Sequence, residues 1–74
     1  MHVFEFIRRE HCALCDMAQA MFDELQLTPG SQRYVDDDEA LEARYGWHVP
    51  VLRRADGAEL RWPFDPVALK AFLR

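Results

Sequence analysis

Two cysteines, Cys12 and Cys15, have the types and the spacing to do chemistry, and the chain has no others. If a helix begins at or just after Cys12, the Cys12 sulfur faces unpaired backbone N–H groups at the positive end of that helix. That field lowers the pKa of the Cys12 thiol and helps to make it a nucleophile. Cys15 follows one helical turn later, where it could attack a mixed disulfide formed on Cys12 and release the product. The pair therefore predicts reversible thiol–disulfide chemistry.

Two other interpretations of the pair remain open. A closed zinc site usually needs four protein ligands, commonly in two separated pairs. This chain has one cysteine pair together with His2, His11 and His48. A metal or iron–sulfur module would use Cys12, with a cluster shared across a dimer. A third class is an interaction domain whose cysteines perform no catalysis. Redox chemistry is favoured, and no residue is assigned as a metal ligand.

Length and composition narrow the classes of function. The 74 residues predict a single domain, 1–74, and 50% of them are apolar, which is enough for a core. The net charge of −4 argues against binding to nucleic acid. No apolar run is long enough for a membrane span, and no signal peptide is recognisable at the amino end. Two cysteines in such a chain predict a cytoplasmic protein in which the pair is catalytic.

The elements that would position the cysteines lie on either side of them. The apolar run Val3–Ile7 predicts a strand buried on both faces, and a polar loop, 8–11, follows it. A helix is predicted from Ala13 to about Leu27, and Thr28–Gly30 would stop it. Its apolar positions have the spacing of one helix face: Leu14, Met17, Ala18, Met21, Phe22 and Leu25.

The middle of the chain predicts a second strand and a short helix. Gln32–Val35 is the weaker strand. Asp36 is expected to cap the helix that follows, because Glu39 stands three residues later at the capping-box spacing. The helix Ala40–Tyr45 would end at Gly46, the usual C′ residue. This helix start accounts for the acidic run without invoking an interaction patch.

The last third predicts a hairpin and a final helix. Val49–Arg54 and Ala58–Trp62 flank Asp56-Gly57, a strong sign of a β-hairpin. Asp65-Pro66 provides an N-cap and a proline at the first helical position. That helix would bury Leu69, Phe72 and Leu73. The order is β-α-β-α-β-β-α, an α/β class with a parallel first βαβ unit and an antiparallel hairpin.

A cysteine pair after the first strand, a β-α-β half, and a Val-Pro that opens a hairpin resemble the thioredoxin fold in its short glutaredoxin form. The chain is most similar to the small glutaredoxin-like proteins. The resemblance implies a three-layer fold with a four-stranded mixed sheet. The matching segments are Arg9–Asp16, Tyr45–Leu52, Asp56-Gly57 and Trp62–Pro66.

The resemblance also implies roles for individual residues. Cys12 would be the attacking thiol and Cys15 the resolving thiol. Pro50 would be the cis-proline beside the active site, and Val49 would offer its backbone N–H and C=O to an extended thiol substrate, as in strand addition. Arg9, three residues before Cys12, would support the thiolate or a substrate carboxylate.

The chain departs from the glutaredoxin pattern after the last strand. Glutaredoxins usually carry Gly-Gly and then an Asp there, where the γ-glutamyl end of glutathione is held. Here Trp62-Pro63-Phe64 replaces the glycines, so a ligand could approach the backbone less closely, and only Asp65 remains. The usual Cys-Pro-Tyr-Cys is absent as well, because Ala13-Leu14 stands between the cysteines.

Two histidines and several other side chains have alternative roles. His11 would stabilise the Cys12 thiolate or relay a proton, or it is an exposed loop residue. His48 would face the cysteines or stand in solvent. Trp47 and Trp62 would line a substrate groove or pack on the core. The remaining arginines of the strand ends are expected to face solvent: Arg8, Arg53 and Arg54.

The sequence as a whole predicts a cytoplasmic thiol–disulfide oxidoreductase or redox carrier with substrate contacts at Arg9, His11, His48, Val49-Pro50 and Asp65. It would be a monomer without a tightly bound cofactor. Its substrates would be disulfides of proteins or small thiols, and its electrons would come from glutathione or a reductase. No nucleic acid or membrane is expected as a partner.

Overall fold

A four-stranded mixed sheet organises the chain in the computed structural model, which describes residues 2–74. The strands follow the order β2-β1-β3-β4. β1 runs parallel to β2 and antiparallel to β3, and β3 and β4 form an antiparallel hairpin. The elements are β1 (Phe4–Arg8), α1 (Ala13–Glu24), β2 (Ser31–Tyr34), the 3-10 turn η1 (Val35–Asp37), α2 (Glu39–Tyr45), β3 (Val51–Arg54), β4 (Glu59–Arg61) and α3 (Pro66–Leu73).

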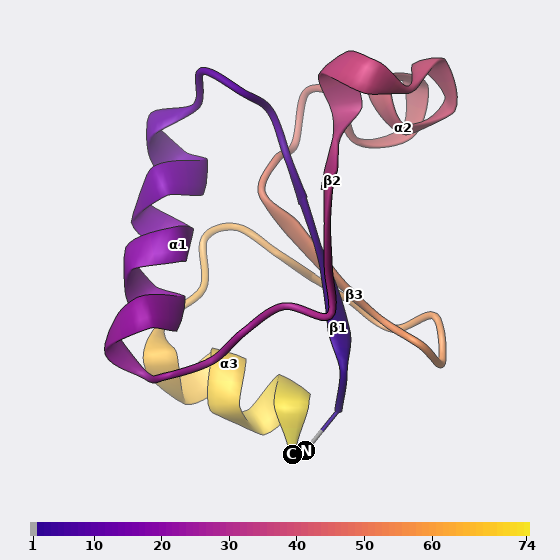
Figure 1. Cartoon of the computed structure of the whole chain (residues 1–74). Helices are drawn as coiled ribbons and strands as arrows, with labels where there is room; N and C mark the ends of the chain where they lie inside the picture. Colours follow the sequence, from indigo (N-terminus) through magenta and orange to yellow (C-terminus); the bar gives the residue numbers. More distant parts are fainter. Residues whose placement is uncertain (1) are drawn as a thin grey trace.

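The two faces of the sheet bury separate apolar clusters, which confirms the predicted three-layer arrangement. Helices α1 and α3 lie on one face, and α2 lies on the other near one end of the strands (Figure 1). Phe4 and Phe6 of β1 point towards α1, where both rings meet Phe22 edge-on at centroid distances of 5.4 and 4.8 Å. Ile7 belongs to the second cluster with Tyr45 of α2. Because β1 contributes to both clusters, it is the buried central strand that its apolar run predicts.

Helix α1 ends earlier than its apolar periodicity predicts. Its last residue is Glu24, and Gln26 has the left-handed φ of 57°. The N–H of Leu27 donates to Phe22 O at 2.8 Å, and the N–H of Gln26 donates to Asp23 O at 3.2 Å. These are the two hydrogen bonds of a Schellman cap, in which an apolar residue after the helix continues to pack on the core. The apolar spacing therefore extends into the cap, and the helix does not.

The start and end of α2 correct the sequence prediction. Asp38, and not Asp36, is the N-cap, and its Oδ1 accepts from the N–H of Ala40 at 2.9 Å and of Leu41 at 3.2 Å. The residues before it form the 3-10 turn, which moves the helix start along the chain. Gly46 has a right-handed φ of −55°, so it is not the left-handed C′ glycine. A Cβ there would collide with Glu42, which is the reason a glycine fits.

The hairpin and the last helix form as predicted. Gly57 has a φ of 92° in the turn between β3 and β4, a conformation that favours glycine. Asp65 caps α3 by accepting from the N–H of Ala68 at 2.8 Å, and Pro66 is the first helical residue. Leu69 and Leu73 are fully or almost fully buried. No helix within residues 2–74 has the length and apolar character needed to cross a membrane.

Candidate functional site

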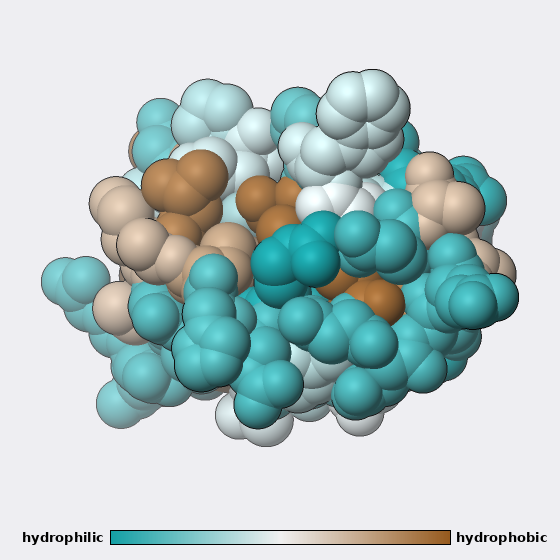
Figure 2. Space-filling model, turned by 90° about the horizontal axis from the view of Figure 1, so that it is seen from above, coloured by the Kyte–Doolittle hydropathy of each residue, from teal (hydrophilic) through white to brown (hydrophobic). Residues whose placement is uncertain are grey.

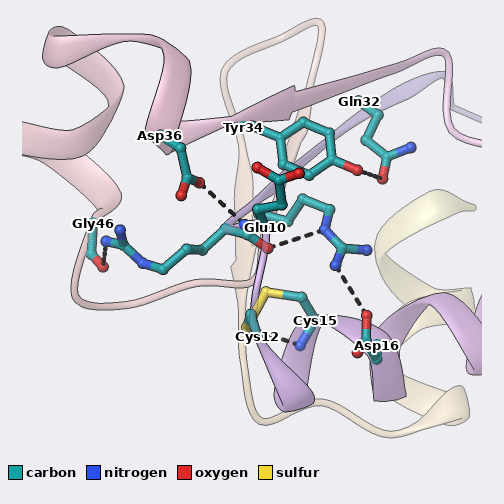
Figure 3. Close-up of a disulfide and its surroundings, with 10 residues drawn as sticks. Glu10, Cys12, Cys15, Asp16, Gln32, Tyr34, Asp36 and Gly46 are labelled. Carbon is teal, nitrogen blue, oxygen red and sulfur yellow. Dashed lines mark hydrogen bonds and ion pairs between the residues drawn. A yellow bond between two sulfur atoms is a disulfide. The ribbon is translucent and has the colours of Figure 1, made fainter.

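The cysteine pair lies at the amino end of α1, where the loop after β1 meets the helix. Cys12 is the N-cap residue, and its Sγ accepts a hydrogen bond from the N–H of Cys15 at 3.1 Å. The two sulfurs form a disulfide, with Cα atoms 5.2 Å apart (Figure 3). The cap places the sulfur of Cys12 where the unpaired N–H groups of the first turn point. A negative charge on that sulfur would be stabilised by the helix terminus.

The two sulfurs differ in their access to solvent. Cys15 is fully buried and belongs to the apolar cluster beneath α1, whereas Cys12 is partly exposed and packs on the edge of that cluster. A substrate approaching from outside can therefore reach Cys12, while Cys15 can react only with an atom already bound at Cys12. This asymmetry matches the two predicted roles of attacking and resolving thiol.

Arg8 is buried, which corrects the prediction that it faces solvent. It is the last residue of β1, and only 8% of it is exposed. Its guanidinium lies 5.6 and 5.3 Å from the ring centroids of Phe6 and Tyr34, and its Nη2 donates to Asp16 Oδ1 at 2.9 Å. Arg8 therefore neutralises the acid that directly follows Cys15 (Figure 3).

Arg53 and Arg54 are also engaged rather than free at the strand ends. Arg53 pairs with Glu5 at 2.8 Å across β1 and β3. Arg54 pairs with Asp56 at 2.7 Å and donates to Phe72 O, also at 2.7 Å. The side-chain exposure of 27% for Arg53 and 20% for Arg54 shows that the expected solvent-facing positions are wrong. Both arginines tie the hairpin to its neighbours.

Arg9 is held by helix α2 instead of pointing at the sulfurs. Its Nη2 donates to both carboxylate oxygens of Glu42, at 3.0 and 2.8 Å, and to Gly46 O at 2.5 Å. The charge predicted to support a thiolate or a substrate carboxylate is therefore already paired with an acid. The same bonds fix the loop before Cys12 to the end of α2.

The Val49-Pro50 peptide bond is cis, as the resemblance implies. Pro50 is buried at the start of β3, and its carbonyl accepts from the N–H of Trp62. Within residues 2–74 neither the N–H nor the C=O of Val49 has a hydrogen-bond partner, since it stands just before the paired part of β3. Val49 thus offers one backbone donor and one acceptor at the end of the strand. A second cis bond, Trp62-Pro63, was not predicted.

A shallow groove of about 200 Å³ joins the cysteine turn to the turn before β3. His48 closes one side of it, because its Nε2 lies 2.9 Å from Trp62 O. A carbonyl oxygen can only accept, so that nitrogen carries the hydrogen. Seen from above, pale and brown side chains gather along one side of the molecule, and hydrophilic (teal) ones along the other (Figure 2). The groove is lined by Leu14, Trp47, His48, Val49 and Trp62.

The other predicted site residues have different positions. His11 is exposed beside Cys12 and makes no hydrogen bond among the described side chains. Asp65 is exposed, its carboxylate caps α3, and it does not line the groove. Among residues 2–74, no three His, Cys, Asp or Glu side chains come together in a way that could hold a metal ion.

Two residues with a place at the site escaped the sequence analysis. Glu42 holds Arg9, but 33 positions separate them, and an acid in the middle of a short helix carries no signal of such a contact. Leu14 was assigned to the core face of α1, yet it is 44% exposed and lines the groove. Its position between the two cysteines, in the first helical turn, could have indicated this.

Comparison with known proteins identifies the family. The sequence model of the family described as Glutaredoxin-like domain (DUF836) matches residues 4–74, and the chain belongs to this family. The chain has the thioredoxin-like fold and carries the C-x-x-C pair at the amino end of α1.

Solved structures resemble the chain over nearly its whole length. The X-ray structure of the structural genomics target protein XcR50 from X. campestris is 41% identical, with a TM-score of 0.86 and coverage of 96% of this chain and 95% of that one. The solution structure of the same target has a TM-score of 0.83. Protein Ne2328 from Nitrosomonas europaea is 26% identical, with a TM-score of 0.79 and coverage of 99% and 92%. A search of curated proteins finds no match.

Proposed function

We propose that this protein is a thiol–disulfide oxidoreductase that reduces substrate disulfides through Cys12 and Cys15. The observation that carries the proposal is the unequal pair itself: an accessible sulfur capping a helix and a buried sulfur one turn later, joined as a disulfide. Membership of the glutaredoxin-like family supports a redox role for this pair.

The reaction has two exchange steps. In the reduced protein, the Cys12 thiolate attacks one sulfur of the substrate disulfide, a Cys12–substrate disulfide forms, and the other substrate sulfur leaves as a thiolate that takes a proton. The Cys15 thiol then loses its proton and attacks the Cys12 sulfur, which forms the Cys12–Cys15 disulfide and releases the second substrate thiol. Two electrons pass from the protein to the substrate; one of the two protons comes from Cys15 and the other from solvent, because Cys12 reacts as the thiolate. A thiol donor returns them in the reverse sequence.

The backbone at Val49 is proposed as the docking point. An extended segment on either side of the substrate sulfur can pair with the free N–H and C=O of Val49, adding a short strand beside β3. Pro50 shapes this turn, and His48 holds it against Trp62. His11 stands beside Cys12, where its imidazole can exchange a proton with the leaving thiolate.

The remaining predictions form part of the same proposal. The electrons come from glutathione or from a reductase, no cofactor is tightly bound, and the protein acts as a monomer in the cytoplasm. The reducing environment of that compartment supplies the thiol donor the cycle requires.

The test is a pair of single substitutions in a coupled disulfide-reduction assay. Cys12→Ser should abolish turnover, because it removes the attacking sulfur. Cys15→Ser should form the first mixed disulfide and stop, so the substrate accumulates covalently on Cys12 and is detected by non-reducing mass spectrometry. Equal trapping by both variants would contradict the assigned roles, and turnover by Cys12→Ser would contradict the proposal altogether.

A further inference from the structure

We infer that the groove beside the disulfide takes a cationic, apolar segment of a partner protein, and that the Arg9–Glu42 ion pair disfavours anionic thiols such as glutathione. This inference rests on the proposed function and names the substrate class of the same site. It rests on the charges and the apolar surface around Cys12.

The cations nearest to the cysteines in the chain are both neutralised. Arg8 pairs with Asp16 at 2.9 Å, and Arg9 pairs with Glu42 at 2.8 Å while also donating to Gly46 O. Glutathione carries two carboxylates and one ammonium group, so its net charge near neutral pH is negative. A site for it would need at least one cation free to pair with a carboxylate. Neither arginine meets that need while its acid is in place.

Three acids near the site have no ion-pair partner among residues 2–74: Asp36, Asp37 and Glu39. An acidic cleft of about 410 Å³ opens beside Arg9, lined mainly by Asp36–Asp38, Glu39 and Glu42. Asp36 accepts from the N–H of Glu10, which brings a further carboxylate to the loop before the cysteines (Figure 3). The other two acids of the cleft are already paired, Asp38 with Arg33 at 3.4 Å and Glu42 with Arg9 at 2.8 Å, so the uncompensated charge is that of the first three. This field attracts lysine and arginine side chains of a partner and repels anions.

The groove itself is apolar and open. Trp47 is 93% exposed and Leu14 is 44% exposed, an unusual cost for large apolar side chains unless a partner covers them. The free backbone of Val49 lies in the same groove. The cleft adjoins this groove, because Arg9 of the cleft donates to the carbonyl of Gly46, the residue before Trp47. An extended peptide that pairs with Val49 and packs an apolar side chain on Trp47 would therefore have the acidic cleft within reach of a basic side chain. A tripeptide with two carboxylates meets fewer of these features.

The first test compares substrates. Three short peptides each carry one cysteine that is activated as a mixed disulfide with thiopyridine. They differ only in the two residues that flank the cysteine: lysine and leucine in the first, glutamate and leucine in the second, lysine and serine in the third. The glutathione–thiopyridine disulfide is the fourth probe. Release of thiopyridone by the reduced full-length protein should be fastest for the lysine–leucine peptide, and added salt should narrow its advantage over the glutamate peptide.

The second test uses a matched pair of variants. Glu42→Gln removes the partner of Arg9 and should raise the rate with the glutathione probe about two- to fivefold, the range that corresponds to an exposed ion pair. Glu39→Gln makes the same change of net charge in the same helix without releasing Arg9, so it should change that rate much less. Trp47→Ala should slow the lysine–leucine peptide more than the lysine–serine peptide, because only the first has an apolar side chain to lose contact with it.

The outcomes separate the inference from the proposed function. If the glutathione probe is the fastest, or if Glu42→Gln and Glu39→Gln act alike, the inferred selectivity is wrong while the oxidoreductase proposal stands. If none of the four probes reacts faster than with Cys12→Ser, the proposed function itself fails.

Discussion

The unequal surroundings of Cys12 and Cys15 determine which sulfur an outside molecule meets. Cys12 caps the helix at the surface, and Cys15 is fully buried in the α1 cluster. Thiol reactivity depends on the thiolate fraction and on access, and both favour Cys12. The direction of the proposed exchange thus follows from the burial of Cys15 and the exposure of Cys12.

A difference in alkylation rate is the expected consequence at these two residues. In the reduced protein, Cys12 should react with iodoacetamide at least about tenfold faster than Cys15, since burial protects the second thiol. Peptide mapping after brief labelling measures this. In denaturant the two rates should converge, which is the control. Equal rates in the folded protein would show that Cys15 is not protected.

The carboxyl group of Glu59 makes the stability of the protein depend on pH in the acid range. The hydroxyl of Tyr45 donates to its Oε2 at 2.5 Å, and Arg44 and Arg61 lie near. The Tyr45 hydrogen bond, together with these arginines, lowers the pKa of Glu59 below its ordinary value, against the opposing effect of burial. The unfolded chain therefore binds more protons in this range, and stability falls as pH falls from the unfolded pKa through the folded one.

Tyr45→Phe tests this contribution. The variant removes the hydroxyl and should lower the free energy of unfolding at neutral pH by about 1–2 kcal/mol. Its stability should also depend less on pH between about 5 and 3, around the ordinary pKa of a glutamate. Urea unfolding at several pH values measures both effects. An unchanged acid-side slope would mean that the Tyr45 bond does not set the titration of Glu59.

At the scale of the elements, the exact ends of the helices depend on tertiary contacts that the local sequence pattern does not reveal. The types and order of the helices and strands could be predicted because apolar spacing, Asp56-Gly57 and Asp65-Pro66 are local signals. The end of α1 could not be predicted, because the apolar series continues to Leu25, the C-cap residue, and Leu27 still packs on the core from beyond the Schellman cap. The start of α2 was misplaced because Asp36 is used by the N–H of Glu10, from a loop 26 positions away.

Asp65 is the N-cap of α3, so its substitution should change the stability of that helix end. It caps α3, while the family resemblance suggests a contact with substrate. Asp65→Ala should lower the free energy of unfolding by about 1 kcal/mol. Asp65→Asn should leave it close to that of the unsubstituted protein, because asparagine and aspartate are equally good N-cap residues. Thermal unfolding of both variants measures this. If Asp65→Asn is stable but has a raised KM, the carboxylate contacts substrate as well.

At the scale of the molecule, a small domain depends on a few large side chains on each face of one sheet. Phe22 connects α1 to Phe4 and Phe6 of the central strand, and Tyr45 closes the opposite face. The same β1 that carries these contacts leads directly into the cysteine turn. The core thus positions the site, and the two cannot be separated in so short a chain.

Phe22→Ala should remove most of the stability of the protein. Truncation of a buried phenylalanine costs about 3–5 kcal/mol, a large part of what a domain of this size possesses. Met17 was predicted on the apolar face of the same helix, but it is 56% exposed, so Met17→Ala should change the stability by less than about 0.5 kcal/mol. Circular dichroism during urea unfolding distinguishes the two. A similar small loss for both would place Phe22 outside the core.

The site could be predicted as far as its residues are close in sequence. The cysteine pair and the Val49-Pro50 turn carry their own signals, and the turn has the expected cis bond. The ion pairs that neutralise the arginines near the site carry no such local signal. Arg8 pairs with Asp16 across the strand–helix junction, and Arg9 pairs with Glu42 of helix α2. Such pairs depend on the folded arrangement, so they emerge only with the structure.

The most direct test of the central claim is an equilibrium titration of Cys12 and Cys15 in glutathione redox buffers, with the thiol state read by alkylation and mass. The account predicts reversible two-electron oxidation to the Cys12–Cys15 disulfide, with a midpoint between about −200 and −270 mV, the span from glutaredoxins to thioredoxin. If no intramolecular disulfide forms anywhere in the accessible range, the pair does not perform disulfide exchange and the proposed function is wrong.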